Sequence, residues 1–557
     1  MTRVLQAAAA SLLAAVLLVS VAGAAGDAPI VKAVKAGDLQ ALRALIKSGA
    51  DVNGKSGDGS TPLLWATVDS RIDIARALIA AKATVDAAND FGVTPLLHAS
   101  RVGDAAMVDI LLRAGAKPAR AHPEGETPLM AAARSGSLPT VRLLVARGVD
   151  VNAAEAFQQT TPLMWAAAEG HSDVVDLLVE AGADPNRQGH ITSLAQRHNA
   201  DHPTGGFTAL MLAARNGDDE TVRRLAKRGA NLNLKNGDGA SAAMVAIYND
   251  RFDTAATLIN LGSDPNDGSL YFAVEMRDAT TDQFAFDGSR RRPDHKNRNT
   301  ALDLIRTLLE KGADPNGNFS GQLHSTSMPN TDRFDNTPFF RAAVAADVEA
   351  LKLLVTHGAD LEQSPKIAAA PPPVFPAVAG PARGNPNAGR TATMVAMTGG
   401  RGPGMTGGPA YIREGAAPYR EPGSRKPEDA FAVLVAGGAN PNAKGPDGNS
   451  LLHLTARAGN LEMIRALANA KVDFNQKNND GFTALDVAEG KQPAGGARGG
   501  ARGRGGPPPG GRGRGGRGAS QQDVATLLRE LMGLPAPSAG EGPPAAPAPA
   551  PSAEAAQ

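Results

Sequence analysis

The sequence contains no cysteine, and this absence excludes several kinds of site. Without thiolates a protein forms no disulfide framework, holds no cysteine-ligated zinc ion or iron–sulfur cluster, and attaches no haem covalently. A cysteine nucleophile is excluded as well. The fold must therefore be stabilised by packing, and the chain can be exported to an oxidising compartment without forming wrong disulfides.

The sequence also has little net charge and few aromatic residues. Its 57 Lys and Arg residues are balanced by 56 Asp and Glu residues, so the formal charge is +1 and no global field favours a nucleic-acid partner. Aromatic residues make up 4% of the chain, whereas 63 glycines and 40 prolines indicate many turns and cores of small aliphatic side chains. Such a composition suits a repeat protein better than a large enzyme.

Long apolar runs are absent except at the N-terminus. There Arg3 precedes the apolar run from Val4 to Val21, and Ala22-Gly23-Ala24 supplies the small residues that signal peptidase accepts. We therefore expect residues 1–24 to be a signal peptide and the mature protein to be periplasmic or secreted, with no integral membrane segment. The alternative is an uncleaved anchor, because Val4 to Ala25 is long enough to span a bilayer.

A repeated motif occupies most of the remaining sequence. Thr61-Pro62-Leu63-Leu64-Trp65-Ala66 recurs at spacings of 33, 33 and 34 residues, with copies that begin at Thr94, Thr127 and Thr161. A second apolar segment follows each copy, and Gly-Ala-Asp-x-Asn or a related turn recurs at 49–53, 148–152, 182–186 and 312–316. A fixed period of this length indicates a solenoid of stacked units.

The motif predicts a pair of short helices. Thr61 caps the first helix by accepting a hydrogen bond from a backbone N–H group, and Pro62 fits the first helical position because no donor is needed there. In the second segment the apolar residues within 174–178 fall on one face of a helix, which Gly182 ends in the left-handed conformation. Neither helix can bury its apolar face alone, so stacking of neighbouring units makes the core.

The motif and its period resemble the ankyrin repeat family, whose T-P-L-H-x-A signature recurs every 33 residues. The resemblance implies an all-α ankyrin-repeat solenoid of about twelve helix-turn-helix units, on the order of 100 Å long at about 8 to 10 Å per unit. Later units depart from the signature; Thr208, Thr391 and Thr483, for example, are followed by Ala. The first unit covers about 28–59, and the others begin near Thr61, Thr94, Thr127, Thr161, Thr208, Ser241, Leu270, Thr337, Thr391, Ser450 and Thr483.

Long insertions interrupt the period. We expect repeats over 28–363 with insertions at about 187–206, 278–299 and 317–335, and then a Pro-rich linker insertion at 364–390. Further repeats are expected over 391–533 with insertions at about 400–426 and 489–520, followed by a disordered Pro/Ala-rich tail at 534–557. A solenoid accepts such insertions because the cost of loop closure grows only logarithmically with length.

An Arg/Gly-rich run lies within the last insertion. Residues 490–522 contain six arginines and no acidic residue, a pattern found in RNA-binding proteins. No aromatic side chain lies between these arginines to stack on bases, and export removes the usual RNA partners. We therefore interpret this run, like Arg290-Arg291-Arg292, as a solvated loop that can adhere to anionic surfaces, and we expect no nucleic-acid partner.

One insertion contains candidate metal ligands. His190, His198, Asp201 and His202 offer imidazoles and a carboxylate close together in the sequence. The pattern is not a zincin motif, and a loop before Pro203 lacks helical i, i+4 geometry, so we interpret it as a solvated loop and expect no metal or cofactor. No phosphate loop, dinucleotide fingerprint or nucleophile elbow occurs, and we expect no enzymatic activity.

The resemblance implies that a partner is bound by the fingertips and by the residues just after the Ala pair of each first helix. These helix positions are Lys35, Val68, Arg101, Arg134, Ala168, Arg215 and Tyr248, and the fingertip positions are Asp58, Asp90, Phe91, Glu124, Phe157, Phe207 and Asp238. Aromatic and arginine side chains often anchor interfaces, although exposed arginines are also common without a partner. Trp65, Trp165 and Phe272 lie one residue before the first Ala of the signature, and we interpret them as core between units.

The sequence thus predicts an exported, monomeric, non-catalytic scaffold that binds a partner protein through its concave groove and fingertips. The alternative is an envelope-associated adhesive or structural protein that acts through the Arg/Gly-rich and Pro-rich loops. An enzyme is the third class, and no motif supports it.

Overall fold

The computed structural model describes residues 27–191, 205–237, 239–277, 297–317, 337–362, 391–397, 423–491 and 519–535. In these residues the secondary structure is helical and forms twelve consecutive pairs. The pairs are α2 (Pro29–Ala36) and α3 (Leu39–Lys47); α4 (Pro62–Val68) and α5 (Ile72–Ala80); α6 (Pro95–Val102) and α7 (Ala105–Arg113); α8 (Pro128–Ser135) and α9 (Leu138–Val145); α10 (Pro162–Glu169) and α11 (Ser172–Glu180); α12 (Ala209–Asn216) and α13 (Asp219–Lys227); α14 (Ala242–Tyr248) and α15 (Phe252–Asn260); α16 (Ser269–Met276) and α17 (Ala301–Glu310); α18 (Pro338–Val344) and α19 (Val348–Thr356); α20 (Ala392–Met397) and α21 (Pro427–Ala436); α22 (Leu451–Ala458) and α23 (Leu461–Asn469); α24 (Ala484–Ala488) and α25 (Gln521–Leu531).

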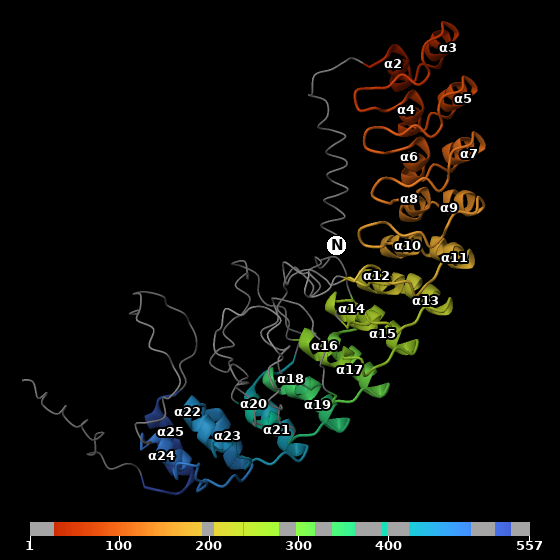
Figure 1. Ribbon diagram of the computed structural model, residues 1–557. Coiled ribbons are helices and arrows are strands. Elements are labelled where there is room, and N and C mark those ends of the chain that lie inside the picture. Colours follow the sequence, from red (N-terminus) through yellow and green to blue (C-terminus); the bar gives the residue numbers. More distant parts are fainter. Residues whose placement is uncertain are drawn as a thin grey trace, which may run out of the picture.

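The pairs, numbered here as units 1 to 12, stack in single file along an arc (Figure 1). The first helices contact one another from unit to unit and line the concave side, while the second helices form the convex row. The expectation of an all-α solenoid of about twelve helix-turn-helix units is therefore confirmed.

Local chemistry begins and ends the first helices as the motif predicts. Thr94 Oγ1 accepts a hydrogen bond from the N–H of Leu97 at 3.2 Å, and Pro95 occupies the first turn. Gly103 then ends the helix in the left-handed conformation, with φ of 76°. A side chain there would be strained, so glycine at this position fixes the sharp turn into the second helix.

The Gly-Ala-Asp-x-Asn turns follow the second helices and link each unit to the next. Asn186 Oδ1 accepts from the N–H of Asn231 at 2.7 Å, and its Nδ2 donates to the carbonyl of Gly229 at 3.2 Å. The same acceptor bond recurs at Asn53, Asn152, Asn233, Asn266, Asn316 and Asn442. Each asparagine thus satisfies backbone groups of the following unit, which explains why the turn sequence recurs.

The buried apolar side chains form two clusters instead of one. The larger cluster runs from Ile30 in unit 1 to Ala439 after α21, and the smaller one includes Met394 and continues to Leu528 in α25. Unit 10 contributes to both clusters, since Met394 belongs to the second and its neighbour Val395 to the first. The boundary between the two clusters therefore lies within unit 10.

Several sequence predictions fall on residues outside the described ranges. These are the signal peptide at 1–24, the Pro-rich linker at 364–390 and most of the other insertions and the C-terminal tail. The base of the 187–206 insertion is described, and there Ile191 and Gly205 form an antiparallel bridge. None of the helices in the described ranges is long and apolar enough to cross a membrane.

Candidate protein-interaction surface

The predicted helix positions are accessible in units 1 to 5. Lys35 and Val68 are exposed, while Arg101, Arg134 and Ala168 are half-buried. Each lies near the C-terminal end of a first helix, and these helices line the concave side (Figure 1). Together with the half-buried side chains of Trp65 and Trp165, these five residues form the surface that we call the groove floor.

Two cations of the groove floor stack on tryptophans of the following unit. Lys35 Nζ lies 3.9 Å from the centroid of the Trp65 ring, and the Arg134 guanidinium lies 4.7 Å from that of Trp165. Both indoles pack against the large core cluster, as the sequence predicts for core between units, but each is only half-buried. The sequence signal for this stacking is a Lys or Arg at the helix position one unit before a tryptophan. It is not visible when each motif is considered alone.

Unit 4 has Ala131 where units 2 and 5 have tryptophan, and the cation before it finds a different partner. Arg101 Nε donates to Glu126 Oε2 at 3.0 Å. Arg134 has its own carboxylate neighbour, Glu169, at 3.7 Å. Such partly exposed pairs contribute little to stability, so a partner's carboxylate can replace the internal one at small cost.

Three predicted contact residues in units 6 and 7 are buried, and this corrects the sequence prediction. Arg215, Tyr248 and Phe207 are only 7%, 2% and 4% exposed. Tyr248 packs edge-to-face on Phe272 with ring centroids 4.6 Å apart, and every residue of α14 is buried. Phe207 directly precedes the capping Thr208, as the buried Val93 precedes Thr94, so it faces inward while the fingertip lies earlier in the turn. Of the seven predicted helix positions, those that are accessible therefore belong to units 1 to 5.

The fingertips of the early units are exposed, with one exception. Phe91 is 54% and Phe157 73% exposed, and Asp90 and Glu124 are also on the surface. Asp58 instead shapes its own turn: burial would raise its pKa, but hydrogen bonds from Ser56 and Ser60 outweigh that effect and hold the pKa below its usual value. Asp238 lies outside the described residues.

Hydrogen bonds join consecutive fingertips into a continuous row. The N–H of Asp90 donates to the carbonyl of Asp58 at 3.1 Å, and His122 Nε2 lies 2.7 Å from the carbonyl of Phe91. Farther along, the N–H of Ala156 donates to the carbonyl of Glu124 at 3.2 Å, and the N–H of His190 to that of Gln158 at 2.8 Å. We call residues 58–60, 90–92, 122–125, 156–158 and 190–191 the fingertip row. The backbone of the row is therefore held in fixed register.

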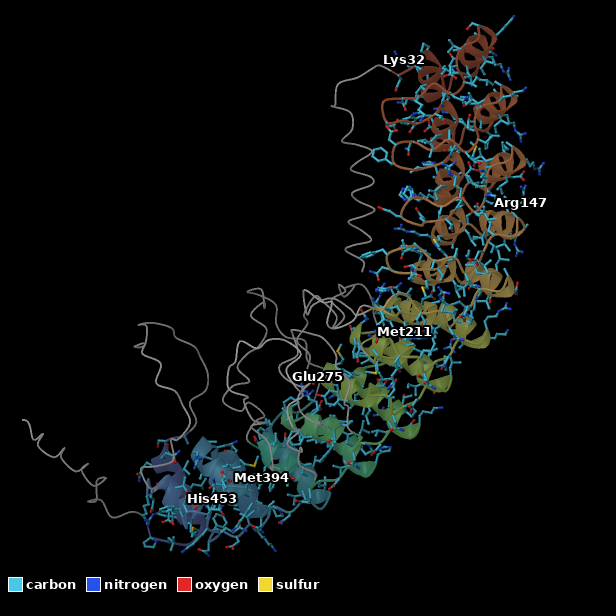
Figure 2. The ribbon with its side chains drawn as sticks, viewed as in Figure 1. Lys32, Arg147, Met211, Glu275, Met394 and His453 are labelled. Atoms are coloured by element: carbon cyan, nitrogen blue, oxygen red, sulfur yellow. The ribbon has the colours of Figure 1, made fainter. Side chains whose placement is uncertain are left out.

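A buried charge cluster lies among units 8, 9 and 10. Arg277 donates to Asp347 through Nε at 2.6 Å and Nη2 at 3.0 Å, and both side chains are 1% exposed. Arg425 Nη2 lies 3.0 Å from the same carboxylate. Beside this cluster Arg341 pairs with Glu275, which Figure 2 places on the concave side. The cluster ties three units together and offers no reactive group to solvent.

A buried histidine makes the last units sensitive to pH. In unit 11, His453 Nδ1 accepts from the N–H of Ser450 at 3.2 Å, and Nε2 lies 2.9 Å from the carbonyl of Phe482. Burial lowers the pKa of His453, and the Phe482 carbonyl opposes this only in part. The folded state therefore keeps the ring neutral, and stability is complete above pH 6.5, the ordinary value, and falls as the pH decreases below it.

We expect His453→Gln to weaken this pH dependence, because glutamine can keep an acceptor and a donor but does not titrate. Urea unfolding followed by far-UV circular dichroism at pH 7 and pH 5 measures it. The wild type is expected to lose more stability than the variant over this interval. An equal loss in both proteins would show that His453 does not carry the effect.

The candidate metal and Arg/Gly sites cannot be placed. His198, Asp201, His202 and residues 492–518 lie outside the described residues, and His190 is exposed. Within the described ranges no group of three or more histidine, aspartate or glutamate side chains is arranged to hold a metal ion.

Comparisons with known proteins agree with the geometry. The family model for ankyrin repeats, in its three-copy form, matches residues 30–122, 96–189, 190–269 and 424–494, which together exceed half of the chain. Among solved structures, the ankyrin repeat domain of human ASB11 is 29% identical, with a TM-score of 0.36, and the match covers 43% of this chain and 99% of that one. The ankyrin repeat domain of Bcl-3, described as a unique member of the IkappaB protein family, is 26% identical with a TM-score of 0.36, over 42% of this chain and 98% of that one. No curated protein matches. On its repeated motif, its stacked helix pairs and the match to the family model, the chain belongs to the ankyrin repeat family.

Proposed function

We propose that this protein is a non-catalytic scaffold that binds a partner protein through the groove floor and fingertip row of units 1 to 5, outside the cytoplasm. Ankyrin repeats generally mediate protein–protein interaction. The observation that carries the proposal for this chain is the coincidence, on one face, of exposed phenylalanines with cations stacked on tryptophan. Aromatic and arginine side chains are the usual anchors of protein interfaces.

Rigidity is the physical basis of the proposed binding. The fingertips are joined by hydrogen bonds, and the floor side chains are held by rings or carboxylates. A preformed surface loses little conformational entropy when a partner docks, so several modest contacts can add up to a useful affinity. We propose a single chain as the binding form, since the groove floor and fingertip row both come from one protomer.

Export is part of the proposal and rests on the sequence of residues 1–24. Arg3, the apolar run to Val21 and the small residues Ala22-Gly23-Ala24 support it. The groove residues then meet partners in the periplasm or outside the cell.

The test combines crosslinking with mass spectrometry in the native envelope and affinity measurement on the partner recovered. We expect Arg101→Glu together with Arg134→Glu to weaken binding at least about tenfold, because charged anchors commonly contribute more than 1 kcal/mol each. Deletion of residues 490–520 should leave binding unchanged. The same spectra read the N-terminus of the recovered protein, and a chain that starts after Ala24 supports export.

The matched control is Arg113→Glu together with Arg142→Glu, an equal charge change at exposed positions of α7 and α9 on the convex row. It should bind like the wild type. Loss of binding on deletion of 490–520, with no effect of the groove variant, would favour the adhesive alternative. Retention of Met1 in the recovered protein would contradict export by cleavage.

A further inference from the structure

The fingertip row exposes a large apolar side chain at three of its five turns. Phe91 is 54%, Phe157 73% and Ile191 49% exposed. Most of the large apolar side chains that the described residues expose lie in units 2 to 5 or in the turn that follows them, since Val68 and Val102 belong to the same region. Apolar side chains gathered on one face of a soluble protein commonly mark a docking surface.

The backbone N–H groups at the two phenylalanine fingertips are already used and are not available to an extended ligand. The N–H of Phe91 donates to Asn89 Oδ1 at 3.1 Å, and the N–H of Phe157 donates to Glu155 Oε2 at 2.6 Å. The next N–H groups are used as well, by Gly92 to Asn89 and by Gln158 to Glu155. Strand addition needs a row of unpaired backbone groups, so these two fingertips do not suit it and offer a ligand their side chains. A helix, whose own backbone is already satisfied, suits such a surface.

The spacing of the row also fits a helix. Neighbouring units are about 8 to 10 Å apart, the usual distance between packed helices. A helix rises 1.5 Å per residue, so it advances about five to seven residues per unit, close to the seven residues after which two turns return the same face. One apolar stripe can therefore meet the apolar fingertips at Phe91, Phe157 and Ile191.

The two surfaces of the protein that would flank such a helix differ in charge. The fingertip side carries Asp90 and Glu124, whose side chain is 88% exposed, next to the phenylalanines. The floor side carries Lys35 and Arg134, which are 35% and 38% exposed and stacked on indoles. A ligand with basic residues towards the fingertips and acidic residues towards the floor is complementary to both sides.

We infer that the partner segment is an amphipathic helix lying along the fingertip row, with apolar side chains at about seven-residue intervals between a basic and an acidic flank. The inference rests on the proposed function and adds the shape and chemistry of the partner.

Photocrosslinking from two fingertips measures the geometry. We replace Phe91 or Phe157 by p-benzoylphenylalanine in the full chain, expressed in its native envelope, and map the crosslinked partner residues by mass spectrometry. The two positions are two units apart, about 19 Å, so a helical ligand places the two crosslinks about 13 residues apart in one segment. An extended ligand would place them about six residues apart, at roughly 3.3 Å per residue, and would overturn the inference.

A second measurement tests helicity directly. In the crosslinked segment, proline at a solvent-facing central position is expected to lower affinity at least tenfold, whereas alanine at the same position has no effect. Equal affinity of the two peptides contradicts the helix while leaving the proposed function standing. Crosslinks obtained from a p-benzoylphenylalanine at Arg142 on α9, with none from either fingertip, contradict the proposed function itself, and the inference with it.

Discussion

Replacing Asp347 with alanine is expected to lower the free energy of unfolding by about 3 to 5 kcal/mol, as removal of one partner from a buried ion pair generally does. The Asp347 carboxylate accepts two hydrogen bonds from Arg277 and faces Arg425, and it also caps α19 by accepting from the N–H of Ala350 at 3.2 Å. Without it, two guanidinium groups would share a buried site that has lost its carboxylate. Urea unfolding followed by far-UV circular dichroism measures the loss.

Two controls separate the parts of this effect. Asp38 holds the equivalent position in unit 1 and caps α3 through Ala41 at 2.8 Å, but it is exposed. Asp38→Ala should therefore report the cap alone, about 0.5 to 2 kcal/mol. Asp109→Ala removes an i, i+4 pair with the exposed Arg113 and should change stability by less than about 1 kcal/mol. If Asp347→Ala were no worse than Asp38→Ala, the buried pair would contribute nothing beyond its cap.

The local structure of each unit could be predicted from the sequence because it depends on neighbours in the chain. Thr94, Pro95 and Gly103 start and end their helix through groups within a few residues of themselves, and the structure agrees. The number of units followed from the same motif. Repetition of a local rule is therefore enough to define the solenoid.

The exposure of individual positions could not be predicted in the same way. Equivalence by period places Tyr248 with Val68, but the ring of Phe272 in the next unit covers Tyr248. Arg277 and Asp347 are 70 residues apart, so no sequence window brings them together. Phe207 is different: its place directly before the capping Thr208 could have been compared with Val93, and that comparison indicates burial.

These differences divide units 1 to 8 of the concave side into two regions. In units 1 to 5 the helix positions are accessible, whereas in units 6 to 8 Arg215, Tyr248 and Glu275 are all buried. The same position of the first helix is therefore accessible to a partner in units 1 to 5, whereas in units 6 to 8 it is part of the packed interior. An interface confined to the first region leaves the buried charge cluster free to hold the middle of the solenoid together.

The division of the core in unit 10 predicts that the last units lose their structure separately from the first. Leu467 in α23 is fully buried in the smaller cluster, and Leu78 holds the matching position of α5 in the larger one. Leu467→Ala is expected to destabilise its own cluster by about 2 to 5 kcal/mol, as buried leucine truncations commonly do. Stability in a solenoid is a sum over units and their interfaces, so this loss need not reach distant units.

Both tryptophans, Trp65 and Trp165, pack against the larger cluster and report on it alone. During urea unfolding of Leu467→Ala we expect circular dichroism to show an early phase, while the midpoint of tryptophan fluorescence stays at the wild-type value. Leu78→Ala makes the same side-chain change in the larger cluster, in the same unit as Trp65, and should shift the fluorescence midpoint. A fluorescence midpoint that moved equally in both variants would mean that the two clusters unfold as one, and that the change of core in unit 10 does not interrupt cooperativity along the stack.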